Sequence, residues 1–210
     1  PLEGQMWYNQ TELKLKGVVA SGAWSSSSPL ITARRSLGGA GIQTAALAFG
    51  GQSTTIIGNT EEYDGSGWAA GGALNTVRKA LGNAGTQTAG LAFGGSTYTA
   101  DTEEYNGTSW SEQNNLSTGR SYLSGCGIQT AGLAFGGSTP PTSSGSTTAT
   151  EEYDGSSWTG GGALSLARYN LTGAGTQTAG LAFGGFVPPG PPYDENVTEE
   201  YNGSSWTEGG

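Results

Sequence analysis

A β-propeller, built from four-stranded sheets packed radially as blades, is the all-β fold that this 210-residue sequence predicts, and three observations favour it. A unit of about 42–48 residues recurs along the chain. Its apolar segments are short, as in strands, and with 39 glycines and 8 prolines hardly any window of eleven or more residues is free of a helix breaker. A four-stranded unit cannot bury its faces alone, so its copies must pack against one another.

The repeat is defined by residues that recur in register. The string AGLAFGG, or AALAFGG in its first copy, ends at Gly51, Gly95, Gly137 and Gly185. Each unit opens with an arginine, at Arg34, Arg78, Arg120 and Arg168. The motif TEEY ends on a tyrosine, at Tyr63, Tyr105, Tyr153 and Tyr201, and a tryptophan follows at Trp68, Trp110, Trp158 and Trp206. These positions predict repeats over about residues 33–76, 77–118, 119–166 and 167–210.

Four strands are predicted in each unit, which in the first copy cover residues 34–42, 45–49, 59–63 and 66–70. Gln43-Thr44 is a two-residue link between the first two strands, and Asp64-Gly65 is a strong hairpin signal between the last two. Gly50-Gly51 ends the second strand where the backbone must turn or approach a neighbour closely.

The region before the repeats is predicted to hold an N-terminal hairpin or connector over residues 1–19, with the propeller over 20–210. Trp24 precedes Trp68 with repeat-like spacing. A five-bladed ring is therefore favoured, in which residues 6–28 supply part of the fifth blade. The open alternative is a ring whose other blades lie outside this sequence, which begins with Pro1 and is expected to be a segment of a longer protein.

Charge and composition exclude several classes of function. The formal net charge is −9, and neither nucleic acid nor a membrane surface is expected as a partner, because both select clustered Lys and Arg. The sequence has no histidine and one cysteine, Cys126. It therefore offers no His-based catalytic triad and no His or Cys zinc site, and we expect no cofactor, no metal and no enzymatic activity.

The arginine that opens the unit, the double glycine, the tyrosine followed by Asp or Asn, and the tryptophan together resemble the kelch motif over about residues 33–210. The near-identical copies TQTAGLAFGG and TEEYDGSSW further resemble kelch-like repeats of bacteriophage tail and virion proteins. Residues 3–11 resemble the short hairpin that phage tail-fibre chains place between modules. The resemblance implies a kelch-type β-propeller in a virion.

The paired glutamates of the TEEY motifs are the nearest approach to a catalytic constellation. Adjacent residues of a strand point to opposite faces, so the two carboxylates of a pair do not converge on one bond, as glycoside hydrolysis needs. We interpret them as structural, with one carboxylate of each pair meeting the arginine that opens a unit in an ion pair between blades. The repeated tyrosines and tryptophans are likewise expected to pack between blades, the alternative being stacking on a sugar.

Ligand-binding candidates are sought where the repeat varies. The segments joining the second and third strands, residues 52–58, 96–101, 138–149 and 186–197, differ in length and content, and binding residues are usually carried by such loops. The candidates are Tyr98, Phe186, Tyr193, Asp194 and Glu195, the last two also as a weak Ca²⁺ contact. The alternative is that these loops are tolerated insertions.

The expected function is a non-enzymatic structural or adhesive module of a phage tail fibre or virion surface. Its partners would be other virion proteins or a host surface glycan, with a homo-oligomer left open. The alternative is a secreted, extracellular domain that binds or hydrolyses carbohydrate.

Overall fold

The computed structural model describes residues 6–9, 14–17, 26–140, 145–188 and 196–209. All regular elements among these residues are β-strands. No helix that is long and apolar enough to cross a membrane occurs in the described ranges.

Four antiparallel sheets of four strands each form the body of the molecule, and we number them blades 1 to 4. Blade 1 holds β3 (Gly38–Ile42), β4 (Ala45–Phe49), β5 (Thr60–Tyr63) and β6 (Trp68–Gly71). Blade 2 holds β7 (Gly82–Gly85), β8 (Gly90–Phe93), β9 (Thr102–Tyr105) and β10 (Trp110–Gln113). Blade 3 holds β11 (Ser124–Ile128), β12 (Ala131–Phe135), β13 (Thr150–Tyr153) and β14 (Trp158–Gly160). Blade 4 holds β15 (Thr172–Thr176), β16 (Ala179–Phe183), β17 (Thr198–Tyr201) and β18 (Trp206–Glu208).

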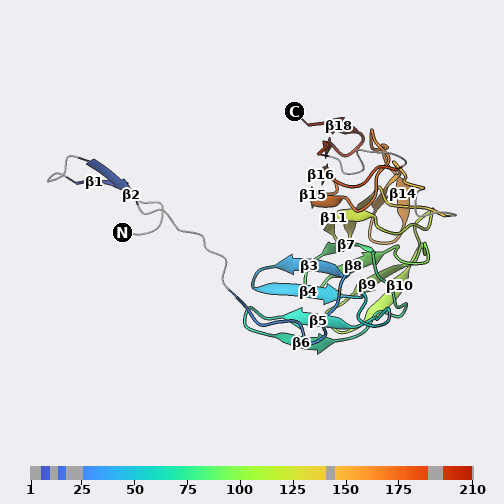
Figure 1. Cartoon of the computed structure of the whole chain (residues 1–210), viewed down its shortest axis with the longest axis horizontal. Coiled ribbons are helices and arrows are strands. Elements are labelled where there is room, and N and C mark those ends of the chain that lie inside the picture. The colour runs from blue at the N-terminus through green and yellow to red at the C-terminus, as the bar shows by residue number, and fades with distance from the viewer. Residues whose placement is uncertain (1–5, 10–13, 18–25, 141–144, 189–195, 210) are drawn as a thin grey trace.

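The blades follow one another in sequence order. The first strands of successive blades contact each other, β3 with β7, β7 with β11 and β11 with β15. Figure 1 shows the four sheets along an arc that runs from blade 1 to blade 4. Repeated four-stranded sheets packed in this way are consistent with propeller blades.

The first strand of the unit begins later than the sequence predicts. In blade 1 the prediction begins at residue 34, whereas β3 begins at Gly38. Ser36 has φ of 54°, and its counterparts Ala80, Tyr122 and Asn170 have φ of 51–56°, a left-handed conformation that no strand can include. The backbone N–H of Ala80 donates to the carbonyl of Ser36, that of Tyr122 to Ala80, and that of Asn170 to Tyr122, at 2.8–2.9 Å. These bent residues thus link the four blades.

The turns follow the sequence prediction in part. Ile42 pairs with Ala45, which leaves Gln43-Thr44 as a two-residue link. Tyr63 pairs with Trp68, so Asp64-Gly65 begins a four-residue loop rather than forming the whole turn. The carboxylate of Asp64 accepts hydrogen bonds from the hydroxyl of Ser66 and from the backbone N–H groups of Gly67 and Ser66, and these lower the pKa of Asp64 to about 2.

The double glycine after the second strand brings two blades together. Gly50 has φ of +64°, and a Cβ at this position would lie 2.7 Å from the carbonyl oxygen of Arg78. The N–H of Gly51 donates to that same carbonyl at 2.8 Å. A side chain here would therefore separate blade 1 from the segment that enters blade 2.

The hydrophobic core lies between blades. Phe49, fully buried, packs among Leu74, Leu81, Ala92 and Trp110, which belong to blade 2 or to the link that leads into it. Phe93 and Phe135 occupy the same position at the next two interfaces. Blades 1, 2 and 3 thus each insert one phenylalanine into a socket formed by the next blade.

The N-terminal strands β1 (Met6–Asn9) and β2 (Lys14–Gly17) pair with each other in a two-stranded sheet of their own. Neither belongs to one of the four blade sheets. Trp24 lies outside the described residues.

Candidate functional site

The variable loops share one face with the segments that enter each blade. Arg35 forms a β-bridge with Gln52, Ser121 with Ser138, and Tyr169 with Phe186. In blade 2 the N–H of Ser96 donates to the carbonyl of Lys79 at 2.8 Å. We call this surface the variable-loop face; its described residues are 34–37, 50–59, 78–81, 94–101, 120–123, 136–140, 145–149, 168–171, 184–188 and 196–197.

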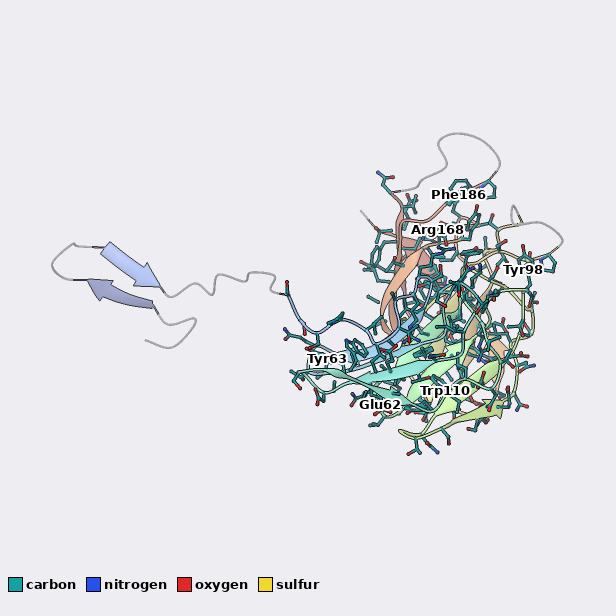
Figure 2. All side chains as sticks on the ribbon, turned by 60° about the horizontal axis from the view of Figure 1, so that its bottom comes forward. Glu62, Tyr63, Tyr98, Trp110, Arg168 and Phe186 are labelled. Atoms are coloured by element: carbon teal, nitrogen blue, oxygen red, sulfur yellow. The ribbon has the colours of Figure 1, made fainter. Side chains whose placement is uncertain are left out.

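Three aromatic side chains form a row on the variable-loop face. The ring centroids of Tyr122 and Tyr169 lie 6.0 Å apart, and those of Tyr169 and Phe186 lie 5.1 Å apart. All three residues are half-buried, so each keeps part of its surface exposed to solvent. We call this row the aromatic strip. Figure 2 places Phe186 on a different side of the molecule from Glu62 and Tyr63.

The aromatic strip occurs once, although the scaffold that carries it is repeated four times. The position of Tyr122 holds Ser36, Ala80 and Asn170 in the other repeats. The position of Tyr169 holds Arg35, Lys79 and Ser121. Sequence reasoning selected Phe186 but missed both tyrosines, because they lie outside the variable loops. Their departure from the repeat was the signal that could have found them.

A shallow depression lies beside the aromatic strip, where the four blades converge. It encloses about 200 Å³ and is lined by the linking residues Ser36, Ala80, Tyr122 and Asn170 and by the leucine that follows each of them. Tyr122 therefore belongs to both the depression and the strip.

Tyr98, another predicted binding residue, is not brought into this strip. Tyr98 is half-buried in the loop that follows β8, with φ of 57°. No ring contact joins it to the strip among the described residues. Tyr193, Asp194 and Glu195 lie outside the described residues.

The arginines that open the repeats form buried ion pairs, and here the structure corrects our expectation. Arg78 contacts Glu103 at 2.7 Å with both side chains fully buried, and Arg34, Arg120 and Arg168 pair in the same way with Glu61, Glu151 and Glu199. Both partners belong to one repeat, so the pair does not join two blades. The arginine side chain turns back from its bent segment onto the third strand of its own sheet.

These glutamates instead hold the segment that arrives from the preceding blade. Glu103 accepts hydrogen bonds from the backbone N–H groups of Asn75 and Thr76, at 2.7 and 3.2 Å. Burial lowers the pKa of Arg78, and the charge of Glu103 opposes that shift. Paired and hydrogen-bonded in this way, the carboxylate has a structural role.

The second glutamate of the TEEY motif makes the contact between blades. Tyr105 donates from its hydroxyl to Glu62 of blade 1, Tyr153 to Glu104 at 3.0 Å, and Tyr201 to Glu152 at 2.5 Å. Burial raises the pKa of Glu104. Burial, followed by the bond to Glu62, raises the pKa of Tyr105 to about 12.

Three of the four repeated tryptophans also lie between blades. The centroid of Trp110 is 4.8 Å from that of Phe49, that of Trp158 is 4.9 Å from Phe93, and that of Trp206 is 5.0 Å from Phe135. Their Nε1 atoms donate to Thr60, Thr102 and Thr150 of the preceding blade. Trp68 of blade 1 is half-buried and packs on Tyr63 of its own blade.

The remaining chemical groups have structural surroundings. Burial raises the pKa of Cys126 to about 11, which disfavours a reactive thiolate at neutral pH. Within the described ranges no group of three or more Cys, Asp or Glu side chains could hold a metal ion.

No protein-family model matches this sequence, and a comparison with curated proteins finds no match.

Proposed function

We propose that this chain is a non-enzymatic structural or adhesive module of a bacteriophage virion, in a tail fibre or surface-decoration protein, that attaches to a glycan on the host surface. Its blades would belong to a kelch-like propeller. A five-bladed ring with residues 6–28 in the fifth blade remains a prediction.

The observation that carries this proposal is the aromatic strip. Tyr122, Tyr169 and Phe186 are half-buried, and their rings lie side by side on the variable-loop face. Aromatic faces stack on the apolar faces of pyranose rings, and a row of them suits an extended saccharide. A receptor must be distinguished by features that occur once, and the strip is such a feature on a fourfold scaffold.

The surroundings of the carboxylates support a role without catalysis. Glu61, Glu103, Glu151 and Glu199 are buried in ion pairs, and Glu62, Glu104 and Glu152 accept hydrogen bonds from tyrosines. A glycosidase needs two carboxylates free to reach one glycosidic bond. Each of these seven glutamates is instead held by an ion pair or a hydrogen bond within the scaffold.

The test uses residues that the chain already tolerates at the equivalent positions. In the triple variant Tyr122→Ser, Tyr169→Ser, Phe186→Ser, the new residues reproduce Ser36, Ser121 and Ser138. Binding is measured by biolayer interferometry against immobilised bacterial surface polysaccharides. The wild-type chain is expected to bind at least one of them and the variant to bind none, with an unchanged melting temperature.

The matched control is Val77→Ser, which removes an exposed apolar side chain away from the strip and should keep binding. Equal binding by the triple variant would refute the aromatic strip as the site. Release of reducing sugar from a bound polysaccharide would instead favour a secreted carbohydrate-active domain.

A further inference from the structure

The three interfaces between blades repeat one set of contacts. The earlier blade contributes a phenylalanine, a threonine hydroxyl, a glutamate and backbone carbonyls. The later blade contributes a socket for the phenylalanine, a tryptophan N–H, a tyrosine hydroxyl and a glutamine side chain. At the first interface, Gln87 donates to the carbonyls of Ala46 and Tyr63. Gln129 and Gln177 do the same at the second and third interfaces.

Blade 4 presents the first half of this set to solvent, on a surface that we call the tail face. Phe183 is 37% exposed, whereas its counterparts Phe49, Phe93 and Phe135 are fully buried. Glu200 is exposed, and no hydrogen bond reaches its carboxylate from any described residue. The carbonyl of Asn170, which would continue the chain of hydrogen bonds through the linking residues, likewise has no partner in the described ranges.

Blade 1 presents the second half, on a surface that we call the head face. A groove of about 390 Å³ is lined by Leu30, Leu37, Ala48 and Trp68, among others. These four residues correspond in the repeat to Leu74, Leu81, Ala92 and Trp110, which surround Phe49. The groove is therefore the socket that the other interfaces fill with a phenylalanine.

Polar groups of the head face are also available. Gln43 is exposed, and the N–H of Ser36 has no partner among the described residues, although the N–H groups of Ala80, Tyr122 and Asn170 all donate to the preceding blade. Tyr63 contacts the hydroxyl of Ser27 instead of a glutamate. The head and tail faces thus carry matching halves of one interface.

We propose that the tail face of one molecule docks on the head face of a second copy of this chain, with Phe183 entering the groove beside Trp68. Tyr63 would then donate to Glu200 of the second copy, and Gln43 would donate to the carbonyls of Gly180 and Tyr201. The two faces differ, so this contact joins molecules head to tail and either closes a ring or continues into a chain.

Among the described residues, the head and tail faces of one molecule lie on blades at opposite ends of the arc. First-strand contacts connect β3 to β7, β7 to β11 and β11 to β15, and Figure 1 shows blades 1 and 4 at opposite ends of the arc. Residues 6–28 are a competing occupant of the head face. However, β1 and β2 pair with each other, and only a complete blade supplies the phenylalanine, glutamate and carbonyls together.

One residue of the head face departs from the internal interfaces. Gly90, Gly132 and Gly180 face the leucine of the preceding blade, and a Cβ at Gly90 would lie 2.7 Å from Cδ2 of Leu47. Blade 1 has Ala46 at this position. Its methyl group would press on the end of the Leu181 side chain, which can rotate away. Docking is therefore allowed but weakened, and Ala46→Gly should strengthen it.

The experiment measures molar mass by light scattering during gel filtration, from about 1 to 100 μM protein. Salt of at least about 150 mM screens the repulsion between acidic copies. Phe183→Lys blocks the tail face. Gly39→Arg blocks the head face, where a Cβ would meet its own blade only at 3.7 Å. The matched control is Gly39→Asn, which reproduces Asn83 of blade 2.

The wild-type chain is expected to be a dimer or larger, as is Gly39→Asn, and Ala46→Gly should associate at lower concentration. Each blocked variant is expected to be monomeric with an unchanged circular dichroism spectrum. An equimolar mixture of the two blocked variants should form a heterodimer, because Phe183→Lys keeps an intact head face and Gly39→Arg keeps an intact tail face. The two altered faces both carry an added positive charge, so they cannot pair with each other.

A monomeric wild-type chain at the highest concentration would overturn the proposal, and occupancy of the groove by residues 6–28 would produce that outcome. A blocked variant that still dimerises would overturn it too, because the contact would then lie elsewhere. Failure of the mixed variants to associate would exclude a head-to-tail contact.

Discussion

The indole of Trp110 packs against Phe49 of the preceding blade, with ring centroids 4.8 Å apart, while its Nε1 donates to Thr60 at 2.9 Å. Trp158 and Trp206 repeat both contacts one and two blades further on. One side chain thus fills apolar space and satisfies a polar group at each interface, so the interfaces should depend on it strongly.

Trp110→Ala is expected to lower the free energy of unfolding by about 3–5 kcal/mol, the range for emptying a buried aromatic site. Urea unfolding followed by circular dichroism measures this change. Trp68→Ala is the matched comparison and should cost less at a concentration where the chain is monomeric, because Trp68 is only half-buried. Equal costs for the two variants would contradict the assignment of Trp110 to the interface.

The Arg78–Glu103 pair gives a second prediction. Glu103→Leu alone leaves a buried guanidinium without its partner and should cost about 3–5 kcal/mol. The double variant Arg78→Met, Glu103→Leu should recover part of this loss but not all of it, because the N–H groups of Asn75 and Thr76 still lose their acceptor. Urea unfolding of both variants tests this, and a double variant worse than Glu103→Leu would contradict it. Polysaccharide binding should be unchanged in any variant that folds.

Alkaline pH should weaken the tyrosine–glutamate contacts between blades. The pKa values of Tyr105 and Tyr201 are raised to about 12, mainly by burial, from about 10 in the unfolded chain. Below pH 10 both states hold the proton and stability is complete. Between pH 10 and 12 the unfolded chain releases protons that the folded chain retains, so stability falls as pH rises. In urea titrations, Tyr105→Phe should have a lower free energy of unfolding than the wild-type chain at pH 8, and it should lose less of that free energy between pH 8 and pH 11. Equal losses in the two chains would refute the raised pKa of Tyr105 as the cause of the pH dependence.

Exchange of one variable loop should separate binding from folding. Replacing residues 186–197 with residues 96–101 keeps the backbone pairing, because the N–H of Ser96 donates to Lys79 as that of Phe186 does to Tyr169. The swapped chain should keep its melting temperature and lose attachment to polysaccharide, since the aromatic strip is broken. The control replaces residues 52–58 of blade 1 in the same way and should bind normally. Full binding by the first swap would leave a spacer role as the better account.

Much of the fold was predictable because strand positions depend on local pattern. The second strand of blade 1 covers Ala45–Phe49 as predicted, and Gln43-Thr44 forms the expected link. The start of the first strand was predicted four residues too early, because nothing in the residue type at Ser36, Ala80 or Tyr122 indicates a left-handed conformation. That conformation is imposed by hydrogen bonds to neighbouring blades.

The candidate site was less predictable. Phe186 was found because its loop varies, but Tyr122 and Tyr169 join it only through the packing of blades 3 and 4. Likewise, the sequence predicted that the opening arginine pairs with a glutamate of the TEEY motif, but it placed that pair between blades. Arg78 and Glu103 lie within one repeat because the bent segment that enters blade 2 turns the arginine side chain back onto its own sheet.

The sequence by itself determined the repeated unit, its four strands and its acidic, histidine-free surface, because periodicity and composition act within each unit. The tertiary structure decided which contacts lie within a blade and which lie between blades, which rings meet on the variable-loop face, and that blades 1 and 4 present matching halves of one interface. These relations depend on how one sheet is placed against the next. Near-identical repeats carry no local signal that distinguishes a face buried between two blades from a face exposed at the end of the arc.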